Sequence, residues 1–216
     1  MSCSLTLKSL SAKKGDRVLF QNVNLSLGHK EKIAIIGSNG RGKTTLLEIM
    51  AGLSTQSSGE IELFHEKISS PKEYQKYRHL VGYLFQNSDE QFIMPTVLED
   101  VSFSLLAHGF SSDEAKKRAL FMLGELGIAH LEKRIVFHLS GGEKKLVALA
   151  GVLVSQPQIM LLDEPTAGLD LDVQLQLTSI LERVDKSVVI VSHDKTFIEK
   201  VVDKIYYLDE NGLNLA

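Results

Sequence analysis

The sequence predicts an α/β fold, with a mainly parallel sheet at its centre, an antiparallel β region near the N-terminus and a helical insert. Three observations lead to this prediction. Short apolar runs recur at 32–36, 80–85, 159–162 and 188–191, and the last two have the unbroken apolar character of parallel strands buried on both faces. A glycine-rich loop follows the first run and opens a segment of helical character. Helical periodicity replaces the strand pattern between residues 87 and 157.

The antiparallel region is predicted from two alternating segments. Residues 4–27 alternate loosely between apolar and polar side chains on both sides of Gly15-Asp16, which indicates a β-hairpin with one wet face. Glu60–Phe64 alternates in the same way, and we expect it to join this sheet. At the other end of the chain, apolar residues 205–208 and 213–215 flank Asn211-Gly212 and predict a small hairpin.

The clearest helical segments are 113–126, 143–155 and 172–184. The last of these lies between two of the apolar runs and should be the crossover helix that joins parallel strands. The chain has 216 residues, of which 44% are hydrophobic and 24% charged, so it can bury one substantial core. We expect a single domain over residues 1–216, with the helical subdomain at 87–157 inserted in the α/β core.

Residues 37–44, Gly-Ser-Asn-Gly-Arg-Gly-Lys-Thr, fit the P-loop pattern G-x-x-x-x-G-K-[ST] between an apolar run and a helix. Phosphate oxygens need a concave row of backbone N–H donors, and glycines let the main chain wrap the anion. Lys43 would place a positive charge on the β- and γ-phosphates, and Thr44 would offer its hydroxyl to Mg²⁺. The alternative, an ordinary glycine-rich turn, does not account for this Lys-Thr pair. The predicted nucleotide-binding residues are Ser38, Asn39, Gly40, Arg41, Gly42, Lys43, Thr44 and Thr45.

Two acids and a histidine follow the later apolar runs. Asp163 and Glu164 come after the run 159–162, where the carboxyl end of a strand presents residues to a ligand. Beside a P-loop, Asp163 is the expected Mg²⁺-orienting group, acting through water, and Glu164 the candidate base for an attacking water. A solvated strand end is the alternative. His193 follows the run 188–191 and should lie at the same edge, although a lone histidine is also an ordinary surface residue.

The segment Leu139–Lys144 reads Leu-Ser-Gly-Gly-Glu-Lys ahead of an apolar helical run. Ser140 and Glu143 have the spacing of a capping box, which is a structural role. Capping does not explain the consecutive Gly141 and Gly142, which lower helix stability relative to alanine and suggest close approach of an anion to the helix start. The residues alone leave both interpretations open.

Charge and composition bear on partners and compartment. The formal net charge of -3 gives no electrostatic reason to expect a nucleic-acid partner. The single cysteine, Cys3, cannot form an internal disulfide, and the N-terminal residues lack the apolar run of a secretion signal, so we expect a cytoplasmic location. The longest apolar stretch, Leu146–Val154, is far shorter than the ~18 residues of a spanning helix. Membrane association must then come through a partner.

Taken together, these motifs resemble the ATP-binding cassette (ABC) ATPases across essentially the whole chain. The matching segments are the P-loop at Gly37–Thr44, a Gln-loop at Gln86, the signature at Leu139–Gly142, the second nucleotide motif at Ile159–Glu164, the D-loop at Ala167–Asp170 and the switch histidine His193. Six motifs in the right order make the resemblance specific, and it favours the functional interpretation of each segment.

The resemblance implies a P-loop NTPase core of the RecA-like type, ATPase activity, and ATP and Mg²⁺ as cofactors. It implies a head-to-tail dimer, formed with an identical or a related cassette, in which the signature of one chain closes over the ATP of the other. The implied signature residues acting in trans are Ser140, Gly141, Gly142 and Glu143, and Asp170 of the D-loop would contact the opposing protomer. The implied catalytic residues are Glu164, His193 and Gln86, and the implied Mg²⁺ set is Thr44, Gln86 and Asp163.

A finer resemblance is to the ATPases of energy-coupling-factor importers, including the cobalt and nickel type. It rests on Val-Gly-Tyr-Leu-Phe-Gln-Asn-Ser-Asp-Glu-Gln-Phe at 81–92 and on the segment 95–101. It implies a peripheral subunit on the cytoplasmic face of the cell membrane that energises import of a small solute, a transition-metal ion or a vitamin. Integral membrane subunits would dock near Gln86–Gln91, where Asp89 and Glu90 would meet basic groups; a solvated acidic turn is the alternative.

Two departures limit the resemblance. The family usually places an aromatic residue near the N-terminal hairpin to stack on adenine, but Ala12-Lys13-Lys14-Gly15 offers none, and Phe20 is the substitute that the sequence suggests. The sequence also ends soon after its last hairpin, without the carboxyl-terminal extension of many importers in this group. We therefore expect no dimer contact through such an extension.

Other functional classes make different demands on the sequence. DNA-structural members of the family carry coiled-coil inserts and translation-factor members carry two cassettes, and this sequence has neither. A soluble ABC ATPase in a cofactor-assembly or other non-transport complex is the alternative function, because it too is a single small cassette. An interaction module with negligible hydrolysis is disfavoured by Glu164 and His193.

Overall fold

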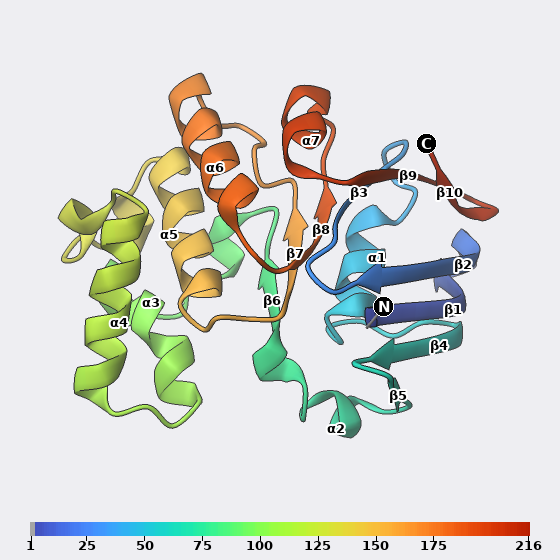
Figure 1. Cartoon of the computed structure of the whole chain (residues 1–216), viewed down its shortest axis with the longest axis horizontal. Helices are drawn as coiled ribbons and strands as arrows, with labels where there is room; N and C mark the ends of the chain where they lie inside the picture. Colours follow the sequence, from blue (N-terminus) through green and yellow to red (C-terminus); the bar gives the residue numbers. More distant parts are fainter. Residues whose placement is uncertain (1–2) are drawn as a thin grey trace.

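Two β-sheets organise the chain in the computed structural model, which describes residues 3–216 (Figure 1). The larger sheet has the strand order β10-β9-β3-β8-β7-β6, and the smaller has the order β2-β1-β4-β5. The larger sheet contains β3 (Lys32–Ile36), β6 (Val81–Leu84), β7 (Ile159–Asp163), β8 (Ser187–Val191), β9 (Lys204–Asp209) and β10 (Gly212–Leu215). The smaller contains β1 (Cys3–Lys14), β2 (Arg17–Gly28), β4 (Ser58–Leu63) and β5 (Glu66–Ile68).

The larger sheet is parallel where the sequence predicted buried strands. β3 pairs in parallel with β8 and β9, and β7 pairs in parallel with β6 and β8. Every residue of β7 and β8 is buried, in agreement with their unbroken apolar runs. Helix α6 (Leu171–Arg183) joins β7 to β8 and is the crossover helix expected at 172–184.

The antiparallel sheet contains the two elements predicted for it. β1 and β2 form the N-terminal hairpin across a turn at Gly15, whose φ of 59° lies in the left-handed region that glycine tolerates. β4 pairs with the other edge of β1. The C-terminal hairpin is also present, but its strand β9 extends the larger sheet beside β3 as well. The sequence did not indicate this pairing, because an alternating pattern does not identify the neighbouring strand.

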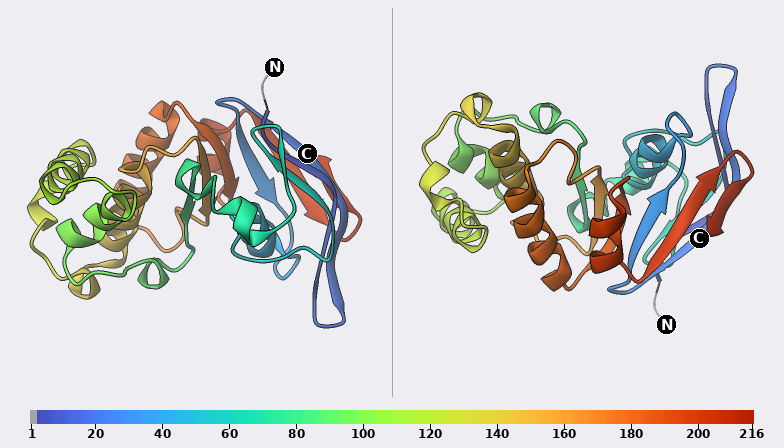
Figure 2. Two further views of the ribbon diagram at one scale, coloured as in Figure 1. Left: turned by 90° about the horizontal axis from the view of Figure 1, so that it is seen from below. Right: turned by 90° about the horizontal axis from the view of Figure 1, so that it is seen from above.

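The remaining α-helices are α1 (Lys43–Met50), α2 (Pro71–Tyr74), α3 (Val97–Ala107), α4 (Ser112–Glu125), α5 (Gly141–Leu153) and α7 (Lys195–Val201). Short 3-10 helices lie at Arg78–Leu80, Ser88–Glu90, Ala129–Leu131 and Val136–His138. Helices α3, α4 and α5 lie together at one end of the molecule, and the β1–β2 hairpin lies at the opposite end (Figures 1 and 2). α5 begins two residues before the expected start at 143, because Ser140 and Glu143 form a capping box. α3 begins at another capping box, which Thr96 forms with Glu99.

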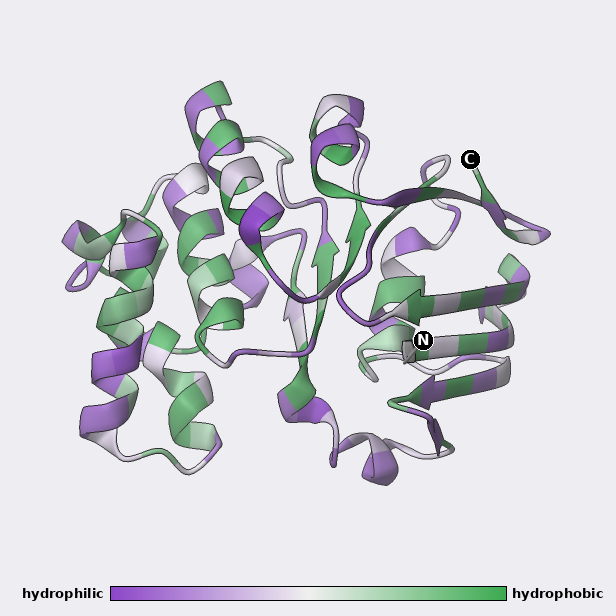
Figure 3. Ribbon diagram, viewed as in Figure 1, coloured by the Kyte–Doolittle hydropathy of each residue, from purple (hydrophilic) through white to green (hydrophobic). Residues whose placement is uncertain are grey.

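The two faces of β7 pack into different hydrophobic clusters. Met160 and Leu162 belong to a cluster with helices α3 to α7, whereas Ile159 and Leu161 belong to a cluster with α1 and the antiparallel sheet. Figure 3 shows β7 and β8 as largely hydrophobic ribbons between these layers. With both faces covered, only the strand ends can present polar groups to a ligand. Among residues 3–216, no helix combines the length and the apolar character needed to cross a membrane.

Candidate functional site

A cleft of about 800 Å³ lies at the edge where the carboxyl ends of β3, β6, β7 and β8 meet. Each strand leads directly into a segment that lines it: the P-loop after β3, Gln86 after β6, Glu164 after β7 and His193 after β8. The sequence-predicted site residues in the cleft wall are Asn39, Gly40, Gly42, Lys43, Thr44, Thr45, Gln86, Asp163, Glu164 and His193. The parallel sheet thus brings residues more than 150 positions apart into one site.

Close backbone approaches that only glycine allows shape the P-loop. A Cβ at Gly37 would lie 2.5 Å from the carbonyl oxygen of Leu208, and one at Gly42 would lie 2.9 Å from Cβ of Leu19. Both glycines also have positive φ values, 151° and 86°. Gly42 is the N-cap of α1, so the first amides of this helix, which have no partner within it, lie at the cleft.

The Lys43 ammonium group folds back onto the P-loop. The residue is 7% exposed, and its Nζ donates hydrogen bonds to the carbonyl oxygens of Gly37 at 2.8 Å and Ser38 at 3.2 Å. Burial lowers the pKa of Lys43, and the negative charges of Glu164 and Asp163 oppose this shift. A phosphate in the loop would give this buried cation a charged partner, which makes stronger hydrogen bonds than a carbonyl does.

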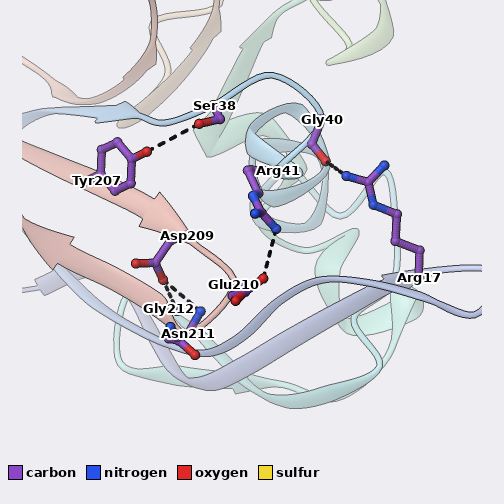
Figure 4. A network of polar contacts seen from close by, with 9 residues as sticks. All are labelled: Arg17, Ser38, Gly40, Arg41, Tyr207, Asp209, Glu210, Asn211 and Gly212. Atoms are coloured by element: carbon purple, nitrogen blue, oxygen red, sulfur yellow. Dashed lines mark hydrogen bonds and ion pairs between the residues drawn. The ribbon is translucent and has the colours of Figure 1, made fainter.

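The side chains of Ser38 and Arg41 face the C-terminal hairpin and do not line this cleft (Figure 4). Ser38 Oγ lies 3.4 Å from the hydroxyl of Tyr207, and Arg41 Nη1 lies 3.2 Å from a carboxylate oxygen of Glu210. Asp209 stabilises the turn that carries Glu210, because its Oδ1 accepts two backbone hydrogen bonds from the residues that follow. In this structure the two side chains brace the P-loop from the side of the β9–β10 hairpin.

Asp163 is a buried acid at the base of the cleft. The residue is 1% exposed, and neither carboxylate oxygen accepts a hydrogen bond of normal geometry from the described residues. Burial raises the pKa of Asp163, and the nearby Thr44 hydroxyl and the charges of Lys145 and Lys43 counteract the rise only in part. Thr44 and Gln86 line the same cleft as this unpartnered carboxylate. The carboxylate, hydroxyl and amide oxygens of the three side chains are the kind of ligands that Mg²⁺ prefers.

Glu164 is held in a strained backbone conformation that aims its carboxylate at His193. Its φ of 45° is unusual for a non-glycine residue, and its amide donates a hydrogen bond to the Val191 carbonyl at 2.8 Å. Glu164 Oε2 accepts a hydrogen bond from the His193 amide at 3.3 Å, and Oε1 lies 3.5 Å from His193 Nε2. Burial raises the pKa of Glu164, and His193 works against that rise.

The end of the cleft away from the acids is formed by the β1–β2 hairpin. Lys14, Arg17 and Leu19 line it, and Arg17 Nη2 donates a hydrogen bond to the Gly40 carbonyl at 3.2 Å (Figure 4). No phenylalanine or tyrosine side chain among the described residues lines the cleft. Phe20, suggested by the sequence as an adenine platform, is wrong for that role, because its side chain is fully buried in the core. Phe20 pairs with Ala12 of β1, and both residues are buried, so this position of β2 faces the core.

Ser140, Glu143 and Asp170 lie outside the cleft and cap helices. Ser140 Oγ accepts a hydrogen bond from the Glu143 amide at 3.3 Å, and a Glu143 carboxylate oxygen accepts one from the Ser140 amide at 2.7 Å. Asp170 accepts a hydrogen bond from the amide of Val173 at 3.0 Å, in the first turn of α6. The capping interpretation of the sequence is therefore confirmed for Ser140 and Glu143.

The two signature glycines differ in their surroundings. A Cβ at Gly142 would lie 3.1 Å from Cγ2 of Val173 in α6, so packing within the chain favours glycine there. A Cβ at Gly141 would meet nothing within 4 Å. Gly141 is exposed at the start of α5, and the surrounding structure gives no reason for a glycine at this position.

Sequence reasoning missed Lys145, a buried lysine next to the site. It is 3% exposed, and its Nζ donates hydrogen bonds to the backbone carbonyls of Phe85 at 3.1 Å and Gln86 at 2.8 Å. The only signal in the sequence is a charged residue at the start of the otherwise apolar run that ends at Val154. Its carbonyl partners have no side-chain signature, so the pairing could not be predicted.

The chain matches the family model described as ABC transporter over residues 20–167. An ABC transporter ATP-binding protein of Brucella suis is 43% identical over 208 residues, which cover 96% of this chain and 86% of that protein. The energy-coupling factor transporter ATP-binding protein EcfA of Methanothermobacter thermautotrophicus is 39% identical over 197 residues, which cover 89% of this chain and 63% of that protein.

Solved structures agree with these sequence matches. cbiO1 of Clostridium perfringens, described as part of the ABC transporter complex cbiONQ, has a TM-score of 0.85 and 32% identity, and the match covers 99% of this chain and 87% of that one. The dimeric ABC transporter cassette MJ0796 has a TM-score of 0.87 and 29% identity, with 97% and 96% of the two chains covered. The chain therefore belongs to the ABC transporter family, and it is an ATPase that couples the hydrolysis of ATP to transport.

Proposed function

We propose that this protein is the nucleotide-binding subunit of an importer that moves a small solute, a transition-metal ion or a vitamin, through separate membrane subunits. The observation that carries the proposal is the similarity, over 99% of the chain, to a subunit of the cbiONQ transporter complex. Identity to EcfA proteins, including one of Methanoculleus marisnigri at 37%, supports the same class of transporter.

The phosphates of ATP would lie against the P-loop. Lys43, now bonded to two carbonyls of its own loop, would turn to the β- and γ-phosphates, and the first amides of α1 would supply further donors. Thr44, Gln86 and Asp163 would hold Mg²⁺, which supplies charge neutralisation to the phosphates when bound. The orphaned oxygens of Asp163 support this assignment, because a buried carboxylate needs a compensating partner.

Glu164 would act as the general base of hydrolysis. Its carboxylate would accept a proton from the attacking water, while the His193 amide and side chain keep it oriented. Because burial raises its pKa, Glu164 is a stronger proton acceptor than an exposed glutamate once it is ionised. Gln86, exposed on the cleft wall, would position the water or the metal.

A head-to-tail dimer would complete each site. Ser140 to Glu143 lie outside the chain's own cleft, and Gly141 is an exposed glycine at a helix N-terminus without a structural reason in the isolated chain. Both properties support a role in trans, closing over the ATP of the opposing protomer. Asp170 would contact that protomer beside the same interface. The dimeric MJ0796 cassette, which matches 97% of this chain, is consistent with such an assembly.

The membrane subunits would dock beside the Gln-loop, at Gln86–Gln91, and hold the protein at the cytoplasmic face of the membrane. Asp89 and Glu90 are exposed there. In the isolated chain Asp89 pairs with Lys144 at 2.8 Å and Glu90 accepts a hydrogen bond from Asn87 at 3.2 Å. Basic groups of a partner would compete with Lys144 and Asn87 for these acids.

The test begins with the Glu164→Gln variant. We expect it to bind ATP and accumulate a closed dimer while turnover falls by roughly two to four decades, the usual contribution of a general base. Unchanged turnover would remove Glu164 from this role. Lys43→Ala is the contrasting variant, because it should weaken nucleotide binding itself.

Glu164→Gln also tests the transport assignment. Tagged and isolated from gently solubilised cells of its own source, it should co-purify with a polytopic membrane protein and a small membrane-embedded binding subunit. Recovery of soluble partners alone would contradict the importer and favour a cofactor-assembly complex. If the binding subunit does co-purify, the solute can be identified from it, because specificity for the solute would lie in the membrane-embedded subunits.

A further inference from the structure

Lys145 is a buried cation that has no role in the mechanism of ATP hydrolysis proposed above. It lies on α5, five residues after Ser140, and is 3% exposed. Buried lysines are normally paired with a carboxylate. No carboxylate within residues 3–216 forms an ion pair with Lys145; the partners of its ammonium group are the backbone carbonyls of Phe85 and Gln86.

These two hydrogen bonds fix the segment that leaves β6 and enters the cleft. Each joins a full positive charge to a carbonyl dipole in a site with little water, which makes it stronger than a hydrogen bond between neutral groups. Gln86 is exposed on the cleft wall, and its carbonyl is the closer partner at 2.8 Å. The position of the Gln86 backbone is therefore set by α5.

The contacts of α5 with this segment continue beyond Lys145. Gln91 spans the two elements, because its Nε2 donates to the Ala148 carbonyl at 2.8 Å and its Oε1 accepts from the Phe85 amide at 3.3 Å. The ion pair between Lys144 and Asp89 adds an outer contact. Residues 85–91 are thus attached to α5 at both ends and in the middle, whereas β6 supplies only their starting point.

α5 and residues 85–91 together reach two different sites. The start of α5, Ser140 to Gly142, lies outside the chain's own cleft, whereas the segment held by Lys145 carries Gln86 into that cleft. The negative charges of Asp163 and Glu164 also act on Lys145, and they oppose the lowering of its pKa by burial. Lys145 thus links α5, which begins at the signature, to the segment that carries Gln86 into the cleft.

We propose that Lys145 is a positioning residue that makes α5 and residues 85–91 move as one body, so that closure of the signature on one ATP places Gln86 at the other. The inference rests on the proposed function, because it requires the two-site dimer. It assigns to Lys145 the coupling between the sites and no contact with ATP. Its loss should then affect turnover and loop order and leave nucleotide binding by the single chain intact.

Lys145→Met tests the inference, since methionine fills a similar volume without donor or charge. We expect the affinity of the single chain for ATP to stay within about twofold and kcat to fall about tenfold, the size of one lost charge-assisted hydrogen bond. Lys145→Arg should recover part of kcat. The matched control is Lys133→Met, whose lysine is 90% exposed and contacts Glu132 at 3.7 Å, and it should behave as the wild type.

Hydrogen exchange provides a readout that a purely structural role would not give. In a Glu164→Gln background, ATP should slow amide exchange in both 37–44 and 85–91, and adding Lys145→Met should keep the first effect and abolish the second. Equal protection of 85–91 with and without Lys145, or an unchanged kcat, would overturn the inference. So would a loss of ATP affinity in step with kcat.

Two further controls keep the outcome clear. Lys145→Gln retains two N–H donors, so if Lys145→Met does not fold, Lys145→Gln must show reduced kcat with normal ATP affinity, and wild-type kcat in it would overturn the role of the charge. Failure of the Glu164→Gln chain itself to dimerise with ATP would contradict the proposed dimer. A normal dimer with unaffected coupling contradicts only the role of Lys145.

Discussion

Buried charged groups of the cleft lack the partners that a bound ligand would supply. Asp163 is a buried acid whose carboxylate accepts no hydrogen bond of normal geometry from residues 3–216, and burial raises its pKa above the ordinary value of 3.8. The folded chain therefore binds this proton more tightly than the unfolded chain. The stability contributed by this group is fully present below pH 3.8, falls as the pH rises through the window between 3.8 and the raised pKa, and stays reduced above it.

The first prediction concerns Asp163→Asn. In the absence of nucleotide and metal, we expect the variant to be more stable than the wild type at pH 8 by about 1 kcal/mol, because the unpaired buried charge is removed. The gain should shrink as the pH is lowered toward 5. Urea unfolding at several pH values measures it, and a variant less stable than the wild type at pH 8 would show that the ionised carboxylate is stabilised by the fold.

The second prediction concerns the base of the nucleotide. Because the cleft offers Arg17 and no aromatic ring at its hairpin end, we expect the planar guanidinium to lie against the base. Arg17→Ala should weaken ATP binding about tenfold, and Arg17→Tyr should restore it by stacking. Calorimetry with ATP and with tripolyphosphate, which has no base, distinguishes stacking on the base from a contact with the phosphates. If Arg17→Lys binds as the wild type and Arg17→Tyr does not, the role of Arg17 is charge.

At the scale of secondary structure, consecutive residues at the start of α5 serve two different purposes, helix formation and ligand binding. Ser140 and Glu143 form the capping box that stabilises the helix start, and this role needs no ligand. Gly141 weakens the same helix without a packing reason, and Gly142 packs against Val173. Substitutions within this one helical turn can therefore separate effects on the stability of the fold from effects on ligand binding.

The third prediction uses this pair of glycines. Gly141→Ala should raise the free energy of unfolding of the single chain by about 0.5 kcal/mol, since alanine favours helix and its Cβ meets nothing. Gly142→Ala should raise the free energy of unfolding by less than this, or lower it, because the new Cβ would press on Val173. Both should impair the ATP-dependent dimer. A Gly141→Ala chain that dimerises with ATP as the wild type does would remove this glycine from the interface.

At the scale of the whole molecule, the cleft of one chain is only part of the proposed site. The P-loop and the acids lie on the sheet edge, whereas the signature lies at the start of α5, outside that cleft. A symmetric pair of chains can bring the two together twice, and each complete site then contains residues from both chains.

The fourth prediction tests this arrangement by mixing two inactive chains. Lys43→Ala and Ser140→Ala should each have little ATPase activity alone. Mixed in equal amounts, they should recover about one quarter of wild-type activity, because half of the randomly formed dimers contain one intact site of two. Phosphate release during titration of one variant into the other measures it. No recovery from chains that exchange freely would contradict a site shared between protomers.

The sequence by itself determined the parts whose requirements are local or periodic. The P-loop follows from a strand, three glycines, Lys43 and the helix of Leu46 and Leu47, because its backbone geometry depends on adjacent residues. The parallel strands follow from unbroken apolar runs. Since such strands end at one edge of the sheet, the sequence alone places Glu164 and His193 close together, as the structure has them. The capping box at Ser140 is equally local.

The tertiary structure decided everything that depends on which surfaces meet. It buried Phe20 in the core, brought Arg17 to the Gly40 carbonyl, braced Arg41 with Glu210, and joined Lys145 to the Gln86 segment. Periodicity indicates that a face is apolar and leaves open what covers it. A lysine that binds backbone carbonyls has no counterpart in the sequence, because every residue carries the same carbonyl. Only packing selects the two that Lys145 reaches.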